Sequence, residues 1–215
     1  MSKPRILITG FGPFPGAPVN PTQALVQRLA TLRRPAFADV ERVAHVFPVT
    51  YSAVDRELPQ LLVQHRPDAL LMFGLASRTP FVRVETRARN AVTMLWPDAD
   101  HTRVRQASIV HGADAVGFGP HTARLLRAAL GSGVDARISR NAGSYLCNYL
   151  SWRGIEAACQ VDGPRLAAFI HVPLLARDAA SRRMTLEELV DAGEAMLLET
   201  IRLTRAKLRE PRRMA

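Results

Sequence analysis

The chain has 215 residues, 47% of them hydrophobic, and a formal net charge of +10, a composition that predicts one globular domain over residues 1–215. No apolar stretch approaches the ~20 residues of a membrane-spanning helix, and the first apolar segment is far too short for a signal peptide, so we expect a cytosolic protein with no membrane partner. Almost all basic residues are arginine, with lysine only at positions 3 and 207, and we do not expect a nucleic-acid partner.

The first half of the chain alternates short apolar runs with longer stretches of helical period. This pattern is typical of an α/β domain with a mainly parallel sheet. Asn20-Pro21 predicts a helix start, because asparagine caps helices and proline is favoured at the first helical position. We expect strands at about 5–9, 42–49 and 69–73, and helices at about 21–33 and 52–64.

The second half continues this alternation. Residues 81–95 alternate strongly and predict longer, hairpin-like β structure. The last helix is expected to begin at Thr185, where Glu188 occupies the capping-box position. It is expected to end in a basic tail over about 205–215, which has no interleaved aromatic residues for stacking on bases. Further helices are expected at about 120–130 and 142–159, and strands at about 135–139 and 166–172.

Cys147 is the first candidate for chemistry. It follows the Gly-containing segment 141–146, which predicts a turn ahead of a helix and places the thiol in the first or second helical turn. Free N–H groups and the positive end of the helix dipole would favour a thiolate there and could receive a developing oxyanion. The alternative is a small buried hydrophobic side chain, the usual fate of a free cysteine. Cys159 has no such setting and is expected to be structural, and both cysteines are expected to be free thiols.

His171 lies at the C-terminal end of the apolar segment 167–172. In open α/β sheets, ligands bind outside the carboxyl ends of the strands. The pKa of imidazole lies near neutrality, so this histidine is a candidate for proton transfer. The alternative is a hydrogen-bonded histidine at a sheet edge. The other five histidines lie in less suggestive surroundings.

Glu85 lies in the strongly alternating segment. Period-two alternation places it on one strand face with Arg83, Arg87 and Arg89. A solvated face, with Glu85 paired to the arginines, explains this pattern without any function. The other interpretation is a carboxylate that orients a catalytic histidine, and the segment alone does not decide between the two.

The segment 9–14 follows the first strand and contains Gly10 and Gly12. The third glycine of a dinucleotide-binding motif is absent and no Gly-Lys-Ser/Thr occurs, so a phosphate-binding loop is not predicted. Phe11 and Phe14 suit the walls of a small apolar pocket, and the alternative is simple loop packing. No cluster of His, Cys, Asp and Glu has the spacing of a zinc site.

Together these segments resemble the pyroglutamyl peptidase I family of cysteine peptidases. The resemblance covers nearly the whole chain, with the motifs in the same order. Glu85, with Asn90 five residues later, is similar to the two ends of the family's Glu-Arg-x-x-x-Asn pattern. The other motifs that carry the resemblance are Ile6–Phe14 with Asn20-Pro21, the cysteine motif Ala142–Asn148 and the histidine motif Phe169–Pro173.

The resemblance implies a single three-layer α/β/α domain, no cofactor or metal, and a homo-oligomer, often a tetramer. The activity it implies is removal of an N-terminal pyroglutamyl residue from a blocked peptide, by thiolate attack and hydrolysis of an acyl-enzyme. The roles that carry over are nucleophile for Cys147, general base and acid for His171, and orienting partner of that histidine for Glu85. The resemblance also implies a substrate pocket formed by Phe11, Phe14, Leu75, Tyr145 and Leu146.

The chain departs from the family at two places. The family's Gly-Gln-Ala-Gly-Gly-Arg segment is replaced by Gly74–Thr79, where Leu75 stands in place of a polar residue and Arg78 is shifted by one position. The family's Ala-Arg-Ile-Pro-Asp-Asn segment is replaced by Met94–Ala99, where Leu95 stands in place of an arginine. Two alternatives therefore stay open. One is the same triad acting on another small acyl or amide substrate, and the other is a peptidase-like binding protein with little turnover.

Overall fold

The computed structural model describes residues 3–14, 16–112, 114–176, 178, 181 and 183–209. A six-stranded sheet forms its centre, in the order β2-β1-β3-β8-β4-β7, and all neighbouring pairs are parallel except β4 with β8. Strands β5 and β6 form a separate antiparallel pair. The strands are β1 (Arg5–Phe11), β2 (Glu41–Phe47), β3 (Ala69–Leu75), β4 (Val82–Glu85), β5 (Arg87–Arg89), β6 (Ala115–Gly117), β7 (Ala136–Ser139) and β8 (Leu166–Val172).

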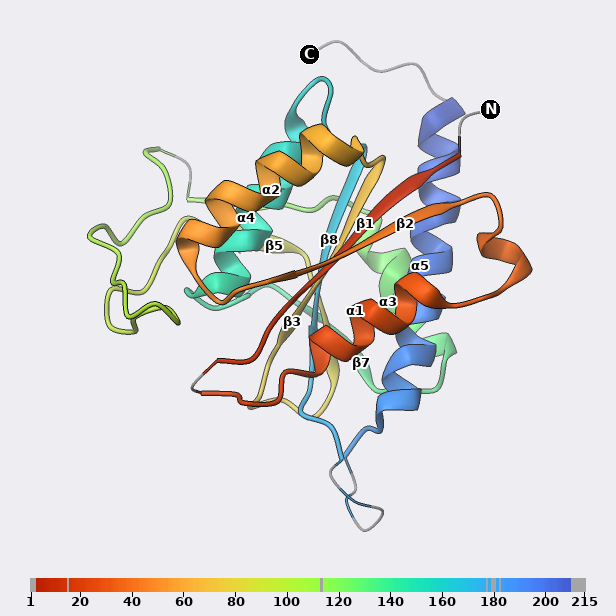
Figure 1. Ribbon diagram of the computed structural model, residues 1–215, viewed down its shortest axis with the longest axis horizontal. Helices are drawn as coiled ribbons and strands as arrows, with labels where there is room; N and C mark the ends of the chain where they lie inside the picture. The colour runs from red at the N-terminus through yellow and green to blue at the C-terminus, as the bar shows by residue number, and fades with distance from the viewer. Residues whose placement is uncertain are drawn as a thin grey trace.

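Helices cover both faces of the sheet, which confirms the predicted three-layer α/β/α fold. Figure 1 shows α2 and α4 on one side and α1, α3 and α5 on the other. Alternate residues of a strand point to opposite faces. In β1, Ile6 and Ile8 therefore belong to the core beneath α1, α3 and α5, whereas Leu7 and Phe11 belong to the core beneath α2 and α4. The helices are α1 (Pro21–Thr31), α2 (Tyr51–His65), α3 (Thr122–Gly131), α4 (Leu146–Cys159) and α5 (Leu186–Arg209), with a short 3-10 helix at Pro35–Phe37.

Capping side chains set two helix starts that the sequence predicts. The Asn20 side chain accepts a hydrogen bond from the Thr22 N–H at 3.2 Å, ahead of α1. At the start of α5, the Thr185 N–H donates to Glu188 Oε2 at 2.7 Å, and the Glu188 N–H donates to Thr185 Oγ1 at 3.2 Å. Both arrangements satisfy N–H groups that a helix start leaves free.

Two element predictions were wrong in their extent. The alternating segment 81–95 is strand only as far as Arg89, and it is divided between the central sheet (β4) and the separate pair with β6. Helix α4 begins at Leu146 instead of about residue 142. Gly143 has a φ of +85°, which an α-helix does not allow, so the preceding residues form a turn.

The C-terminal basic segment also differs from its prediction. Helix α5 continues to Arg209, so residues 205–209 are helical where a tail was expected. Arg205 forms an ion pair with Asp39 at 2.6 Å, and the Lys207 ammonium donates to the Arg165 carbonyl at 2.9 Å. Residues 210–215 lie outside the described residues. Among the helices that the structure describes, none is long and apolar enough to cross a bilayer.

The carboxyl ends of β1, β3 and β8 lie at one edge of the sheet. Helix α1 leaves β1 on one face, and α2 leads into β3 on the other, so the winding of the chain reverses between β1 and β3. Such a switch point is where open α/β sheets bind ligands.

Candidate active site

His171 and Glu85 form a buried pair at this edge. His171 lies in β8 and Glu85 ends β4, and the antiparallel pairing of the two strands places Arg83 opposite His171. The Nδ1 atom of His171 lies 2.7 Å from the Oε1 atom of Glu85. Glu85 is fully buried and His171 is 4% exposed. The interpretation of Glu85 as part of a solvated face was therefore wrong, because the carboxylate contacts the imidazole inside the fold.

Arg83 is a further member of this cluster that sequence reasoning did not assign. Its Nη2 atom lies 2.8 Å from Glu85 Oε1 and 2.8 Å from Ser139 Oγ, and it also donates to the Asn141 carbonyl. The guanidinium thus joins the carboxylate to the segment that leads into α4. The available signal was the alternation itself, which places Arg83 and Glu85 on the same strand face.

Burial and pairing shift the pKa values of Glu85 and His171 in opposite directions. Burial raises the pKa of the Glu85 carboxyl, but the hydrogen bond and charge of His171 and the charge of Arg83 outweigh it, so the pKa lies below its ordinary value. Burial lowers the pKa of His171 below its ordinary value, and the hydrogen bond to Glu85 offsets only part of this change. The pair at neutral pH is therefore an ionised carboxylate beside a neutral imidazole.

Cys147 is the second residue of α4, and its sulfur lies against β3. A Cβ atom placed on Gly74 would be 2.7 Å from the Cys147 Sγ atom, closer than real side chains approach. Gly74 is the register partner of His171. Paired residues of neighbouring strands point to the same face, so the sulfur lies over the strand position beside the histidine. Glycine at position 74 leaves the room for it.

Polar anchors hold the start of α4. The Asn148 side chain donates to the carbonyls of Arg89 at 2.7 Å and Ala91 at 2.9 Å, and accepts from the Arg89 N–H at 2.9 Å. The Tyr145 hydroxyl donates to the Pro97 carbonyl at 2.9 Å. In the described part of the chain, Tyr145 at the N-cap makes no side-chain capping hydrogen bond. The N–H groups of the first turn are thus not occupied by a capping side chain.

The pKa of the Cys147 thiol is higher than a position at a helix start favours. Burial raises the pKa of this thiol to about 12, and the Glu85 carboxylate adds to the effect. This effect of burial opposes the thiolate that a position at a helix start favours. The thiol needs a base to remove its proton. Cys147 and Cys159 are both free thiols, as expected, and Cys159 is exposed.

Four of the five predicted substrate-binding residues lie at the same edge. Phe11 ends β1 and is 2% exposed, and Phe14 lies half-buried in the turn that follows. Tyr145 and Leu146 are at the start of α4. All four belong to, or pack against, the core beneath α2 and α4, which Cys147 also joins. These four side chains and the thiol therefore belong to one apolar region of the fold.

Leu75 is the fifth predicted substrate-binding residue, and its side chain is directed to the other face of the sheet. It follows Gly74 and pairs with Val172. Because side chains alternate along a strand, Leu75 is directed to the face of Val172, opposite to the face that Cys147 contacts. The alternation of β3 therefore does not bring Leu75 to the thiol.

The two segments that depart from the family each contain exposed residues. Leu95 is 76% exposed and Trp96 is 68% exposed, although the segment is fixed at Pro97 by Tyr145. Arg78 is also exposed. Asn90 has an internal role, because its side chain accepts from the Ile109 N–H at 2.6 Å and donates to the Val110 carbonyl at 2.8 Å. Asn90 thus fastens the loop that follows β5.

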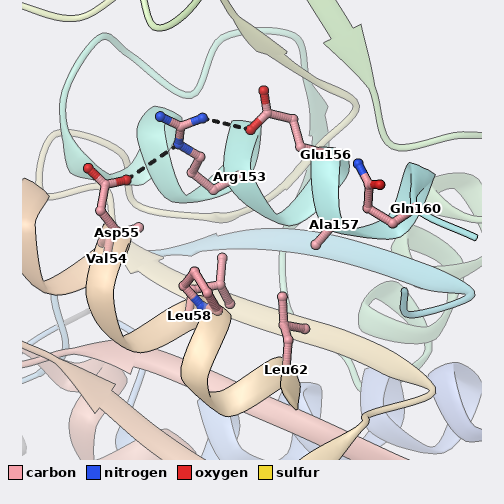
Figure 2. A pocket seen from close by; sticks show the side chains of 9 residues that line it. Val54, Asp55, Leu58, Leu62, Arg153, Glu156, Ala157 and Gln160 are labelled. Atoms are coloured by element: carbon pink, nitrogen blue, oxygen red, sulfur yellow. Dashed lines mark hydrogen bonds and ion pairs between the residues drawn. The ribbon is translucent and has the colours of Figure 1, made fainter. Parts of the chain in front are cut away.

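A hollow elsewhere on the molecule is separate from this cluster. Figure 2 shows it between α2 and α4, with Leu58 and Leu62 on one side and Ala157 on the other. Arg153 bridges its rim, 3.5 Å from Asp55 and 2.8 Å from Glu156. No cysteine or histidine lines it. Within the described ranges, no three His, Cys, Asp or Glu side chains gather in a way that could hold a metal ion.

Comparisons with known proteins agree with this geometry. The family model described as pyroglutamyl peptidase matches residues 4–201. Pyrrolidone-carboxylate peptidase from Thermococcus onnurineus is 30% identical over 202 residues, covering 92% of this chain and 99% of the relative. The enzyme of that name from Vibrio vulnificus is 32% identical over 199 residues, covering 90% and 91%.

Solved structures of similar proteins share the fold. A mutant pyrrolidone carboxyl peptidase from Pyrococcus furiosus has a TM-score of 0.83 at 25% identity, covering 93% of this chain and 99% of that chain. The corresponding protein from Fervidobacterium islandicum has a TM-score of 0.82 at 26% identity, covering 92% and 98%.

Proposed function

Because the chain belongs to the pyroglutamyl peptidase family, we propose that Cys147, His171 and Glu85 act together to remove an N-terminal pyroglutamyl residue from peptides. The observation that carries the proposal is the meeting of the three groups at one sheet edge. The sulfur contacts Gly74, Gly74 pairs with His171, and His171 lies 2.7 Å from Glu85. This is the order of nucleophile, base and orienting carboxylate in covalent acyl transfer.

His171 is set to act as the base. An ionised carboxylate can only accept hydrogen bonds, so the Nδ1 atom of His171 carries the proton that Glu85 accepts. The lone pair is then on Nε2, and the lowered pKa keeps the imidazole neutral at neutral pH. The Cys147 proton passes to Nε2 as the sulfur attacks the pyroglutamyl carbonyl. The imidazolium that forms is stabilised by the Glu85 carboxylate.

The start of α4 receives the negative charge that develops on the carbonyl oxygen. The N–H groups of the first turn point out of the helix end, and the helix dipole is positive there. A bond forms between Cys147 Sγ and the carbonyl carbon, and the C–N bond of the substrate breaks. His171 gives its proton to the departing amine. Water then attacks the thioester, loses a proton to His171 and releases pyroglutamate, and that proton returns to the sulfur.

The apolar surroundings of the thiol suit the blocked terminus. Pyroglutamate is a small, uncharged ring with one hydrogen-bond donor and one acceptor. Phe11, Phe14, Tyr145 and Leu146 provide apolar walls for it, whereas an ordinary aminopeptidase needs a carboxylate for a charged α-amino group. Leu75 is not included in these walls, because its side chain is directed to the opposite face of the sheet.

A substrate panel tests this function. Release of a fluorescent amine is measured from its pyroglutamyl, alanyl, prolyl and acetyl amides. We expect hydrolysis that prefers the pyroglutamyl amide and is lost after thiol alkylation. Preference for another acyl group would favour a different small acyl or amide substrate. Binding of the pyroglutamyl amide without turnover would indicate a binding protein, and either result would contradict the proposal.

The chain is further expected to work as a cytosolic homo-oligomer, with a tetramer as the form that the family resemblance implies. Sedimentation equilibrium of the purified protein measures this directly. A single species of tetramer mass is the expected result, and a monomer at micromolar concentration would contradict it.

A further inference from the structure

Tyr51, the first residue of α2, has a buried hydroxyl without a hydrogen-bond partner among the described residues. The side chain is 7% exposed. Two neighbouring tyrosines differ from it. The Tyr145 hydroxyl donates to the Pro97 carbonyl, and the Tyr149 hydroxyl donates to Asp55 at 2.7 Å. Buried polar groups almost always have a partner, so the free hydroxyl indicates that its partner comes from outside the chain.

The position of Tyr51 connects it to the catalytic edge. Its ring meets the Tyr145 ring edge-on at 6.0 Å and the Tyr149 ring at 5.1 Å, so it packs against the first turns of α4 on both sides of Cys147. Its backbone N–H donates to Asp98 at 3.2 Å, which fixes the start of α2. The ring belongs to the same apolar core as Phe11, beneath α2 and α4.

The charge state of the hydroxyl makes it a hydrogen-bond donor. Burial raises the pKa of Tyr51 well above its ordinary value, and the charges of Tyr145, Asp98, Tyr149 and Cys147 raise it further. The group therefore stays protonated at every physiological pH.

The substrate ring needs such a donor. A lactam carbonyl loses its hydrogen bonds to water when it enters an apolar pocket, and it must find a replacement. Phe11 and Leu146 offer no side-chain donor, and the Tyr145 hydroxyl is already bonded to Pro97. Leu75 is apolar and directed to the opposite face of the sheet.

We propose that the Tyr51 hydroxyl donates a hydrogen bond to the lactam carbonyl oxygen of the pyroglutamyl ring and thereby determines specificity for it. This inference rests on the proposed function of the site. The oxyanion of the scissile carbonyl has a different partner, the N–H groups at the start of α4. Tyr51 thus acts on binding of the ring rather than on the chemical step.

The test compares Tyr51→Phe with Tyr149→Phe as a matched control. The wild type and both variants are assayed on the pyroglutamyl amide, and 2-pyrrolidone, the bare lactam ring, is used as a competitive inhibitor. In Tyr51→Phe we expect KM for the amide and the inhibition constant of 2-pyrrolidone to rise together by about 10- to 100-fold, the loss of one buried hydrogen bond. The melting temperature should not fall, because no internal bond is removed. Tyr149→Phe should lower the melting temperature and leave both constants unchanged.

Two results would overturn the assignment. One is an unchanged inhibition constant for 2-pyrrolidone in Tyr51→Phe, including the case in which kcat alone falls, because the hydroxyl would then not bind the ring. The other is a lower melting temperature with equal loss on every acyl amide, which would mark a structural role. Failure of the proposed function is a separate observation, since the wild type itself would then not hydrolyse the pyroglutamyl amide.

Discussion

Cys147→Ala is expected to lower kcat on the pyroglutamyl amide by roughly 10⁴- to 10⁶-fold, which is the loss seen when a covalent nucleophile is removed. Alanine has no nucleophilic group, so the thioester cannot form. The variant should still fold, because only the sulfur is lost from a side chain at the end of the apolar core. Steady-state fluorescence measures the rate, and circular dichroism measures the fold.

Cys159→Ala is the matched control for this prediction. Cys159 is the last residue of the same helix, and it is exposed. Its replacement should leave kcat and KM unchanged and should leave the protein sensitive to thiol alkylation. Loss of activity in Cys159→Ala together with full activity in Cys147→Ala would show that Cys159, and not Cys147, is the nucleophile.

Glu85→Gln is expected to lower kcat by about 10³- to 10⁴-fold, because an orienting carboxylate fixes the tautomer of the histidine and stabilises the imidazolium. The pH profile should change as well. The hydrogen bond and charge of Glu85 raise the pKa of His171 against the effect of burial. Removing that charge lowers the pKa of His171 further. The acid limb of the kcat/KM profile should therefore move to lower pH while the rate falls at every pH.

Glu57→Gln is the control for this variant. Glu57 also pairs with a histidine, at 2.9 Å from His45 Nε2, but this second pair joins α2 to β2 and is partly exposed. We expect no change in rate or pH profile. If Glu85→Gln and Glu57→Gln behave alike, Glu85 has no special role in orienting His171.

The cysteine and the histidine could be proposed from local sequence alone. A turn ahead of a helix predicts the setting of Cys147, and the end of an apolar strand predicts that of His171. Both predictions depend on short segments whose local physics decides their structure. The caps at Asn20 and Thr185 were predictable for the same reason.

The role proposed for Glu85 could not be derived in this way. Alternation places it on the polar face of a short strand, which is equally compatible with solvent exposure. The deciding fact is that β4 lies between β8 and β7 in the sheet and runs antiparallel to β8. This pairing joins residues 86 positions apart, and no local pattern encodes it. Tyr51 and Gly74 also depend on long-range packing, so neither was recognised from the sequence.

The protonation state of the Cys147 thiol could not be predicted without the packed structure. The sequence places Cys147 near a helix start, and that position alone favours a thiolate. Burial of the sulfur against Gly74 has the opposite effect and raises the pKa of the thiol. In the C-terminal helix, Arg205 likewise pairs with a residue distant in the sequence, Asp39. That the whole chain forms one domain stays a prediction.

The most direct test of the account is the reaction of the protein with pyroglutamyl chloromethyl ketone, which forms a sulfur–carbon bond and releases chloride. Peptide mapping locates the label, and Cys159 serves as an exposed thiol in the same molecule. The account predicts label on Cys147 alone, with a rate that falls strongly in His171→Ala. Equal labelling of Cys159, or an unchanged rate at Cys147 without the imidazole, would contradict it.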